Sequence, residues 1–442
     1  MTIAPMSMQA VAALAPHEVL SVDPLAPAAI REYNLELPEV GRGSGHAVRL
    51  QGWVLAHDLP IESVAVKFGE DALVRIRPNH PRPDVVDGFG IHDDRVAGFT
   101  TAVNLLGLPE RLHLTVEVEL RGHEQDLPVW LLELTRERVV PSSPMGVAPV
   151  AITTIGRTGS TWLASLLDAH PEIVLYPPWE AEPRYLSYWL EVAKTLTQPS
   201  SYLVPLMPPD MSTDDWWHVR REAPLAYPAD ESVASALTSG HVNAVVDFAR
   251  ARTSAFYEEV ARATRAGGAR LFAEKLLPNA RARRLLREVF PDVREVILVR
   301  DFRDMAASII AIDRRRGYHG FGREPHDDDR AYVARLARAA ESLADAAEAA
   351  AGAMVVRYED LAGDPAGVLG CVLRHLGVAA DPGDVEHMVA AADEPTPERE
   401  SHRTSTDRSA SIGRWRRDLS PEFRAMCEPA FAPSLARFGY SP

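Results

Sequence analysis

The chain has 442 residues, of which 46% are hydrophobic and 25% are charged. This length allows about two or three domains with a sizeable buried core, and the composition is that of an ordinary globular protein. The formal net charge is −15. Because nucleic-acid surfaces are normally basic, we expect no nucleic-acid partner.

Membrane-spanning and disulfide-rich classes are also disfavoured. The sequence contains no run of about 18 apolar residues, so we expect no transmembrane helix. The first basic residue is Arg31, and a start without positive charge is not typical of a secretory signal. The two cysteines, Cys371 and Cys427, suggest neither a disulfide framework nor a cysteine-based metal site. The expected location is the cytoplasm.

The N-terminal third divides into two parts. Residues 1–43 are rich in Ala and Pro with little periodicity, and they predict a poorly ordered arm. Residues 44–140 predict a small all-β, sandwich-like domain. Its clearest strand is 112–120, where apolar residues alternate, and 48–56, 63–68 and 129–134 are further candidates. The pattern leaves open whether this domain binds a ligand or is a structural appendage.

After a Pro- and Ser-containing linker at 141–147, the pattern changes to alternating strands and helices over 148–442. It predicts an α/β domain with a parallel sheet between helical layers, and ligands at the carboxyl ends of the strands. The strand candidates are 150–155, 173–175, 270–273, 295–299 and 353–357. We expect a helical insert over about 183–265, which could wall an acceptor pocket, and an Ala-rich helix over 327–351 with a solvated face.

The stretch 149–168 is the most informative part of this domain. A buried strand leads into Gly156 and Gly159, which allow a sharp turn, and Ser160 and Thr161 stand where a helix begins. The N–H groups and the positive dipole end of such a helix attract anions. A Gly-rich turn alone is as often ordinary as it is phosphate-binding.

Arg157 and Thr158 favour the phosphate interpretation, because they add a cation and a further hydroxyl to the turn. The loop is P-loop-like but is not the loop of a nucleoside triphosphatase. That motif ends in Gly-Lys-Ser/Thr, whereas here Gly159 is followed by Ser160. We therefore expect an anion that is bound without a metal.

A second candidate site lies at 296–308, where a strand ends at Arg300 and Ser308 falls on the following helix. The planar guanidinium of an arginine can bind a phosphate through two hydrogen bonds. Taken alone, the segment is better explained by surface ion pairs of Arg300 with Asp304 and of Arg303 with Asp301.

Together the two segments resemble the sulfotransferases that use 3′-phosphoadenosine 5′-phosphosulfate (PAPS), most closely the carbohydrate and protein-tyrosine branch, which includes many bacterial enzymes. Residues 156–161 look like the family's 5′-phosphosulfate loop, and 299–308 look like its 3′-phosphate motif. Three later segments match in the family's order: 273–279, 356–361 and 411–416. The resemblance covers about 148–440 and leaves the β domain outside.

This resemblance implies a metal-independent, in-line transfer of a sulfuryl group from PAPS, as co-substrate, to a hydroxyl on a small natural product, lipid or glycan. Lys275 and Arg157 would stabilise developing charge. Glu180 is the expected general base and Glu182 its rival. The expected cofactor-binding residues are Arg157, Thr158, Gly159, Ser160, Thr161, Trp162, Arg300, Ser308, Tyr358, Ser411, Gly413, Arg414 and Trp415.

Two other functions stay open. One is a kinase-like phosphoryl transferase with a P-loop, against which the missing Gly-Lys-Ser/Thr argues. The other is a non-catalytic carbohydrate-binding or assembly protein in which the β domain is the working part. The acceptor and the oligomeric state are not indicated by the sequence.

Overall fold

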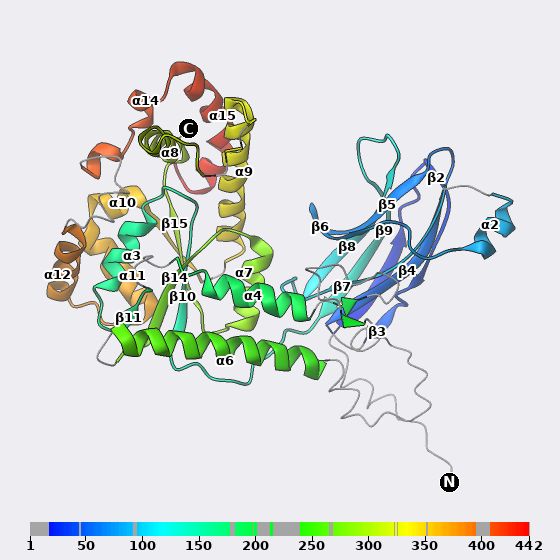
Figure 1. Ribbon diagram of the computed structural model, residues 1–442, viewed down its shortest axis with the longest axis horizontal. Helices are drawn as coiled ribbons and strands as arrows, with labels where there is room; N and C mark the ends of the chain where they lie inside the picture. The colour runs from blue at the N-terminus through cyan, green and yellow to red at the C-terminus, as the bar shows by residue number, and fades with distance from the viewer. Residues whose placement is uncertain are drawn as a thin grey trace, which may run out of the picture. The chain divides into compact units, whose positions relative to one another are not determined.

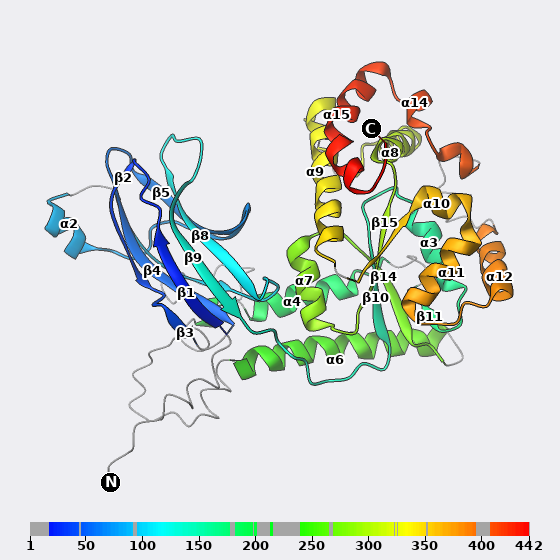
Figure 2. The same ribbon diagram turned by 180° about the vertical axis from the view of Figure 1, so that it is seen from behind.

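The computed structural model describes residues 17–43, 46–91, 95–176, 182–197, 199–200, 213–214, 239–264, 268–321, 323–324, 326–350, 352–394 and 407–441. The chain divides into two compact units. One consists of Met1–Ser143 and Trp189–Ala249, and the other of Pro144–Tyr188 and Arg250–Pro442. Figures 1 and 2 show the elements of each unit from opposite sides.

The first unit is built from two antiparallel sheets that share one core. The larger sheet has the order β3-β1-β9-β8-β5-β6 and the smaller β2-β4-β7. Alternate residues of β8, such as Leu114 and Val116, pack with Leu50 of β4 and Phe99 of β7. The sandwich-like prediction is thus confirmed. The elements are β1 (His17–Pro24), β2 (Ile30–Leu37), β3 (Gly41–Gly43), β4 (Ala47–Ala56), β5 (Ile61–Phe68), β6 (Asp71–Ile76), α2 (Pro83–Phe89), β7 (Val96–Asn104), β8 (Arg111–Leu120) and β9 (Leu127–Arg136).

The predicted poorly ordered arm is wrong for residues 17–43, which form β1, β2 and β3. The reason is non-local pairing. β1 lies antiparallel to β9, with His17 opposite Arg136, and β2 pairs with β4. The ring of Tyr33 on β2 packs edge-on against Trp130 of β9, 5.5 Å between centroids. These strands are ordered by distant partners rather than by a strong local pattern.

The second unit is a three-layer α/β structure around a parallel sheet of order β11-β14-β10-β15-β16. Its strands are β10 (Ala148–Thr153), β11 (Ile173–Val174), β14 (Leu271–Leu276), β15 (Arg294–Val299) and β16 (Met354–Arg357). One face packs on α3 (Ser160–Asp168), α11 (Pro365–Leu376) and α12 (Pro382–Asp393). The other packs on α8 (Phe302–Arg316), α9 (Asp329–Glu348) and α15 (Pro421–Arg437). The predicted fold class is confirmed, and each strand begins or ends within a few residues of its expected bounds.

The remaining described elements are mostly helical. They are α4 (Tyr185–Leu196), β12 (Pro199–Ser200), β13 (Thr213–Asp214), α6 (Ser239–Thr264), α7 (Ala280–Val289), α10 (Tyr358–Gly363), the short 3₁₀ helix η1 (Ser409–Ser411) and α14 (Trp415–Asp418). The expected insert is helical in α4 and α6, and most of 201–238 lies outside the described residues. Within the described ranges, no helix has both the length and the apolar composition needed to cross a membrane.

Candidate active site

The loop between β10 and α3 is held in place by the hydroxyl groups of two threonines. Thr158 is fully buried and its hydroxyl donates to the carbonyl of Ile155 at 3.0 Å. The hydroxyl of Thr154 donates to the carbonyl of Leu298 on β15 at 2.9 Å. These bonds tie the loop to the neighbouring strand. Thr158 therefore holds the loop's shape, and its hydroxyl is occupied by the backbone.

Two glycines allow close packing over this loop. Gly159 has φ of +95°, and a Cβ there would lie 2.4 Å from the ring of Tyr358. A Cβ at Gly156 would lie 2.7 Å from the ring of Phe321. Gly159 is also the N-cap residue of α3, and it has no side chain to accept from the first N–H groups of that helix. The positive end of α3 thus faces the loop with its backbone donors available to a ligand.

Arg157 sits in this turn in a left-handed conformation, with φ of 68°. Its Nε donates to the hydroxyl of Ser308 on α8 at 3.1 Å. Burial and the nearby charges of Arg300, Arg316, Arg315 and Arg414 lower the pKa of Arg157 to about 10. The charged groups among these causes are all arginines, so like charges crowd the Arg157 guanidinium. An anion would relieve this crowding.

Arg300 follows β15 and is buried, with 4% of its surface exposed. Its guanidinium donates to the carbonyls of Arg157 at 3.3 Å and of Ser411 at 2.6 Å. It lies 4.5 Å from the ring centroid of Tyr358. Within the described residues, the Nε of Arg300 is buried without a hydrogen-bond partner, a cost that a ligand accepting from it would remove.

The ion-pair alternative for this segment holds only in part. Arg303 does pair with Asp301, at 2.9 Å, and both are largely buried. Asp304 instead accepts from the backbone N–H groups of Gly413 at 2.7 Å and Trp415 at 2.9 Å. Burial raises the pKa of this carboxyl. Asp304 therefore fastens the C-terminal loop to α8.

That loop brings several of the expected cofactor residues to the same place. The hydroxyls of Ser411 and Tyr358 lie 3.0 Å apart. Trp415 is buried in the core that contains α8, α9 and α15, and its ring lies 4.4 Å from the guanidinium carbon of Arg303. Arg414 pairs with Asp418 at 2.7 Å. Ser411 thus contacts Arg300, whereas Trp415 anchors the loop by packing into the core.

Trp162 extends the same surface along α3. Its ring lies edge-on to Tyr358, with 6.2 Å between centroids, and the guanidinium carbon of Arg408 lies 4.1 Å from its centroid. Aromatic faces and arginine planes of this kind suit a nucleobase.

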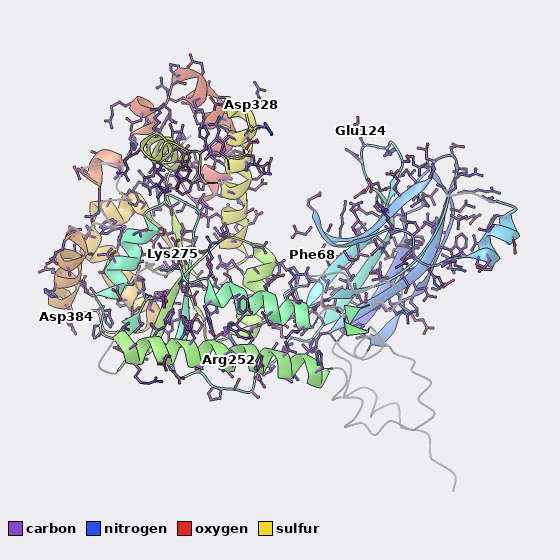
Figure 3. The ribbon with its side chains drawn as sticks, in the orientation of Figure 1. Phe68, Glu124, Arg252, Lys275, Asp328 and Asp384 are labelled. Carbon is purple, nitrogen blue, oxygen red and sulfur yellow. The ribbon has the colours of Figure 1, made fainter. Side chains whose placement is uncertain are left out.

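Lys275 lies near the end of β14, where Figure 3 labels it, and 8% of its side chain is exposed. Its ammonium donates to the hydroxyl of Thr161 at 3.2 Å and to the carboxylate of Glu182 at 3.0 Å. The structure thus joins Lys275 to the start of α3. Glu180 lies outside the described residues, so its predicted role as base stays a prediction.

Four contacts were missed by the sequence reasoning. Asp304 had been read only as an ion-pair partner, and Arg408, Phe321 and Glu274 were not singled out. Asp304 lies inside the segment 299–308, and Glu274 adjoins Lys275. The sequence signal for these two residues was their closeness to a predicted binding motif. The ring of His170 contacts the carbonyl of Ala379 and the N–H of Glu172, both at 3.1 Å.

Among the described residues, no group of three or more His, Cys, Asp or Glu side chains is placed to hold a metal ion. The two cysteines are both free, Cys371 exposed and Cys427 buried. The polar groups around the start of α3 are arginine, lysine, hydroxyl and backbone N–H donors.

Comparison with known proteins identifies a family for this chain. The model of the sulfotransferase family matches residues 149–382. No curated protein matches the chain.

Solved structures with a similar arrangement include the sulfotransferase domain of the Synechococcus PCC 7002 olefin synthase. It shows 18% identity over 69% of this chain and 100% of that one, with a TM-score of 0.38. A sulfotransferase from Alicyclobacillus acidocaldarius shows 16% identity over 67% and 94%, with a TM-score of 0.34. A mouse sulfotransferase complexed with PAP shows 12% identity over 66% and 89%, with a TM-score of 0.34.

Proposed function

The chain belongs to the sulfotransferase family and is therefore an enzyme, and on that premise we propose that it transfers a sulfuryl group from PAPS to a hydroxyl group. The acceptor class is a small natural product, lipid or glycan. The motif pattern favours the carbohydrate and protein-tyrosine branch. No metal is assigned a part in the transfer.

The observation that carries this proposal is the arginine cluster at the turn before α3. Arg157 and Arg300 follow different strands, yet the backbone carbonyl of Arg157 accepts a hydrogen bond from the guanidinium of Arg300. Like charges raise each other's energy unless an anion lies between them. Two arginines, a helix start and the Ser308 hydroxyl make a site for a ligand with two separated anionic groups.

The residues fit PAPS at both of its anionic ends. The helix start at Ser160 and Thr161, with Arg157, would hold the 5′-phosphosulfate. Arg300, through its unsatisfied Nε, and Ser308 would hold the 3′-phosphate. Trp162 and Tyr358 would border the nucleoside, and 411–415 would lie across it. When bound, PAPS supplies the sulfuryl group and leaves as 3′-phosphoadenosine 5′-phosphate (PAP).

In the proposed transfer, a lysine and a carboxylate of this chain have separate roles. Lys275 donates hydrogen bonds where negative charge develops, which is usually the largest single contribution to catalysis of this kind. A carboxylate accepts the proton of the acceptor hydroxyl. We assign that role to Glu180. Glu182 is held in an ion pair with Lys275 and is the alternative base.

The first experiment is a calorimetric titration of the full chain with PAP, with adenosine 5′-phosphate as the control ligand. We expect tighter binding of PAP, because only PAP can occupy the Arg300 and Ser308 end. Absence of PAP binding together with magnesium-dependent ATP turnover would favour a phosphoryl transferase. Absence of both would favour a non-catalytic protein.

The second experiment identifies the acceptor and the base. Sulfur-labelled PAPS is incubated with the chain and an extract of the producing cell, and labelled products are identified by mass spectrometry. Glu180→Gln and Glu182→Gln are then compared on the acceptor found. Loss of transfer only in Glu182→Gln would overturn the assignment of Glu180.

A further inference from the structure

Glu274 is a buried carboxylate that the proposed chemistry does not use. It occupies β14 directly before Lys275 and has no exposed surface. Its two oxygens accept from the N–H of Tyr185 at 2.9 Å and from the N–H of Leu186 at 3.2 Å and 3.3 Å. The hydroxyl of Tyr257 on α6 donates to it at 2.6 Å. These donors mark Glu274 as the anchor of the first turn of α4.

Successive side chains of a strand point to opposite faces of its sheet. Leu271 and Ala273 pack in the core that contains α3, and Lys275, on the same face, reaches Thr161 of that helix. Phe272 packs with Tyr257 on the other face, and Glu274 follows it there. Two adjacent residues of β14 therefore present a cation on one face and an acid on the other.

The segment 182–186 forms hydrogen bonds with both Glu274 and Lys275. Its first residue, Glu182, is bound by Lys275, and its last two N–H groups are bound by Glu274. β11 ends at Val174, opposite Phe272, so the segment attaches to β14 beyond the last residue that β11 covers. A short chain segment tied at both ends has little freedom to move its carboxylate away from Lys275.

We propose that Glu274 is a positioning residue for sulfuryl transfer, which holds the 182–186 segment against β14 and so presents Glu182 to Lys275. The inference rests on the proposed function for the role of Lys275, and on the hydrogen bonds alone for the anchoring. Glu274 lies on the face of β14 away from Thr161 and acts on the reaction only through the segment that it holds.

The anchor is sensitive to pH near neutrality. Burial raises the pKa of Glu274 to about 7, and the hydrogen bonds from Tyr257, Leu186 and Tyr185 oppose this rise without cancelling it. Among the described residues, the titratable group that contacts it is Tyr257 of α6, whereas Tyr185 of α4 contributes its backbone N–H, and β10 places Ala151 opposite it. The ionised carboxylate binds the N–H groups of α4 more strongly than the neutral acid does. The segment is therefore held more firmly above pH 7 than below it.

The first test is amide hydrogen exchange at Tyr185 and Leu186 in the full chain, with Glu274→Ala, Glu274→Gln and wild type compared. Hydrogen bonds to a charged acceptor are worth enough that Glu274→Ala should accelerate local exchange by about ten-fold or more. Glu274→Gln keeps one acceptor oxygen and should fall between the two. Glu258→Gln is the control, since Glu258 lies on the same α6 as Tyr257 but bonds to Ser254.

The second test is the pH profile of turnover on the acceptor identified with labelled PAPS. Wild type should gain activity through an inflection near pH 7, which Glu274→Gln should lack while its KM for PAPS is unchanged. Exchange in Glu274→Ala equal to wild type, or an inflection retained in Glu274→Gln, would overturn the inference. Failure of the wild type to bind PAP would instead overturn the proposed function, and the exchange result would still decide the anchoring.

Discussion

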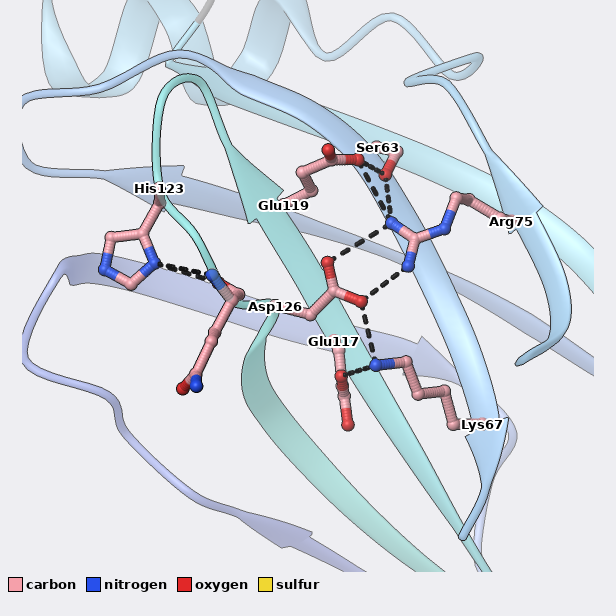
Figure 4. Close-up of polar contacts among 8 residues, drawn as sticks. Ser63, Lys67, Arg75, Glu117, Glu119, His123 and Asp126 are labelled. Atoms are coloured by element: carbon pink, nitrogen blue, oxygen red, sulfur yellow. Dashed lines mark hydrogen bonds and ion pairs between the residues drawn. The ribbon is translucent and has the colours of Figure 1, made fainter. Parts of the chain in front are cut away.

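Two arginines, one in each unit, show how differently the same side chain is used. Arg75 lies on a sheet surface of the first unit and binds Asp126 at 2.5 Å and Glu119 at 3.1 Å, and Lys67 beside it binds Glu117 at 2.6 Å (Figure 4). The hydrogen bond to Asp126 raises the pKa of Arg75. In the second unit, burial and Arg300 lower the pKa of Arg157.

The opposite directions of these pKa shifts distinguish a completed network of opposite charges from a cluster of like charges. On the β sheet each cation meets carboxylates, and the hydrogen bond from Arg75 lowers the pKa of Asp126 to about 2. That network needs no ligand. Around Arg157 the charges that lower its pKa have the same sign, which is the kind of environment that an anionic ligand stabilises. The predictions below test this difference, beginning with the largest effect.

Substituting Lys275 by Ala should give the largest loss. The ammonium beside Thr161 is the donor placed where charge develops, and removing one such donor typically lowers kcat by about 10²–10³. Lys194→Ala is the control, because Lys194 on α4 forms an ion pair with Glu191 in which both side chains are partly exposed. Steady-state rates on the identified acceptor measure the change. Near-normal turnover in Lys275→Ala would exclude its catalytic role.

Glu274 extends the comparison to a buried acid whose described partners are N–H and O–H donors. Its pKa rises from an ordinary 4.5 to about 7 in the folded chain. The folded state therefore binds the proton more tightly than the unfolded state. The stability that this group contributes is fully present below pH 4.5 and is lost as the pH rises to 7. Over about 2.5 pKa units the loss is roughly 3 kcal/mol.

Glu274→Gln should flatten the pH dependence of unfolding between pH 5 and 7, as measured by urea denaturation at a series of pH values. Glu258→Gln, whose carboxylate is exposed, should leave the wild-type slope in place. A Glu274→Gln slope equal to that of wild type would mean that the carboxyl titrates near its ordinary value in the folded chain.

Arg300→Lys tests whether the Arg300 guanidinium, through its Nε, recognises the 3′-phosphate. A lysine keeps the charge and loses the planar pair of donors. We expect PAP affinity to fall by about ten-fold, which is about 1.4 kcal/mol, while adenosine 5′-phosphate binds as before. Calorimetry with the two nucleotides gives both values. Equal loss for both would assign Arg300 to the general charge of the site rather than to one phosphate.

Local pattern was enough to predict the strand, turn and helix at 149–168. A buried strand, two glycines and a helix start follow one another within a short stretch, and β10 and α3 form there. The family resemblance assigned Arg157, Arg300 and Ser308 to one cofactor, and the structure brings them together because β10 and β15 are neighbouring parallel strands. Short-range hydrophobic patterning fixes these elements.

Contacts between distant segments were not predictable in this way. β1 owes its order to β9, and no local signal in 17–24 names that partner. Asp304 became the fastener of 413–415, and Glu274 the anchor of 185–186, because remote backbone N–H groups arrive beside them. A single acidic residue in a sequence does not specify which donors surround it, and those donors decide whether it is a base, a cap or an ion-pair partner.

Lys67→Met should give the smallest effect and tests the completed side of the comparison. Lys67 donates to Glu117 and Asp126 on the sheet of the first unit, but Arg75 remains bound to Asp126 in the variant. Surface ion pairs are worth about 0.2–1 kcal/mol each and weaken with salt. Denaturation should therefore show a loss of about 1 kcal/mol that shrinks in high salt, with PAP affinity unchanged. A change in PAP affinity would contradict the view that this network binds no ligand. Charges that already pair with one another are not expected to contribute to nucleotide binding.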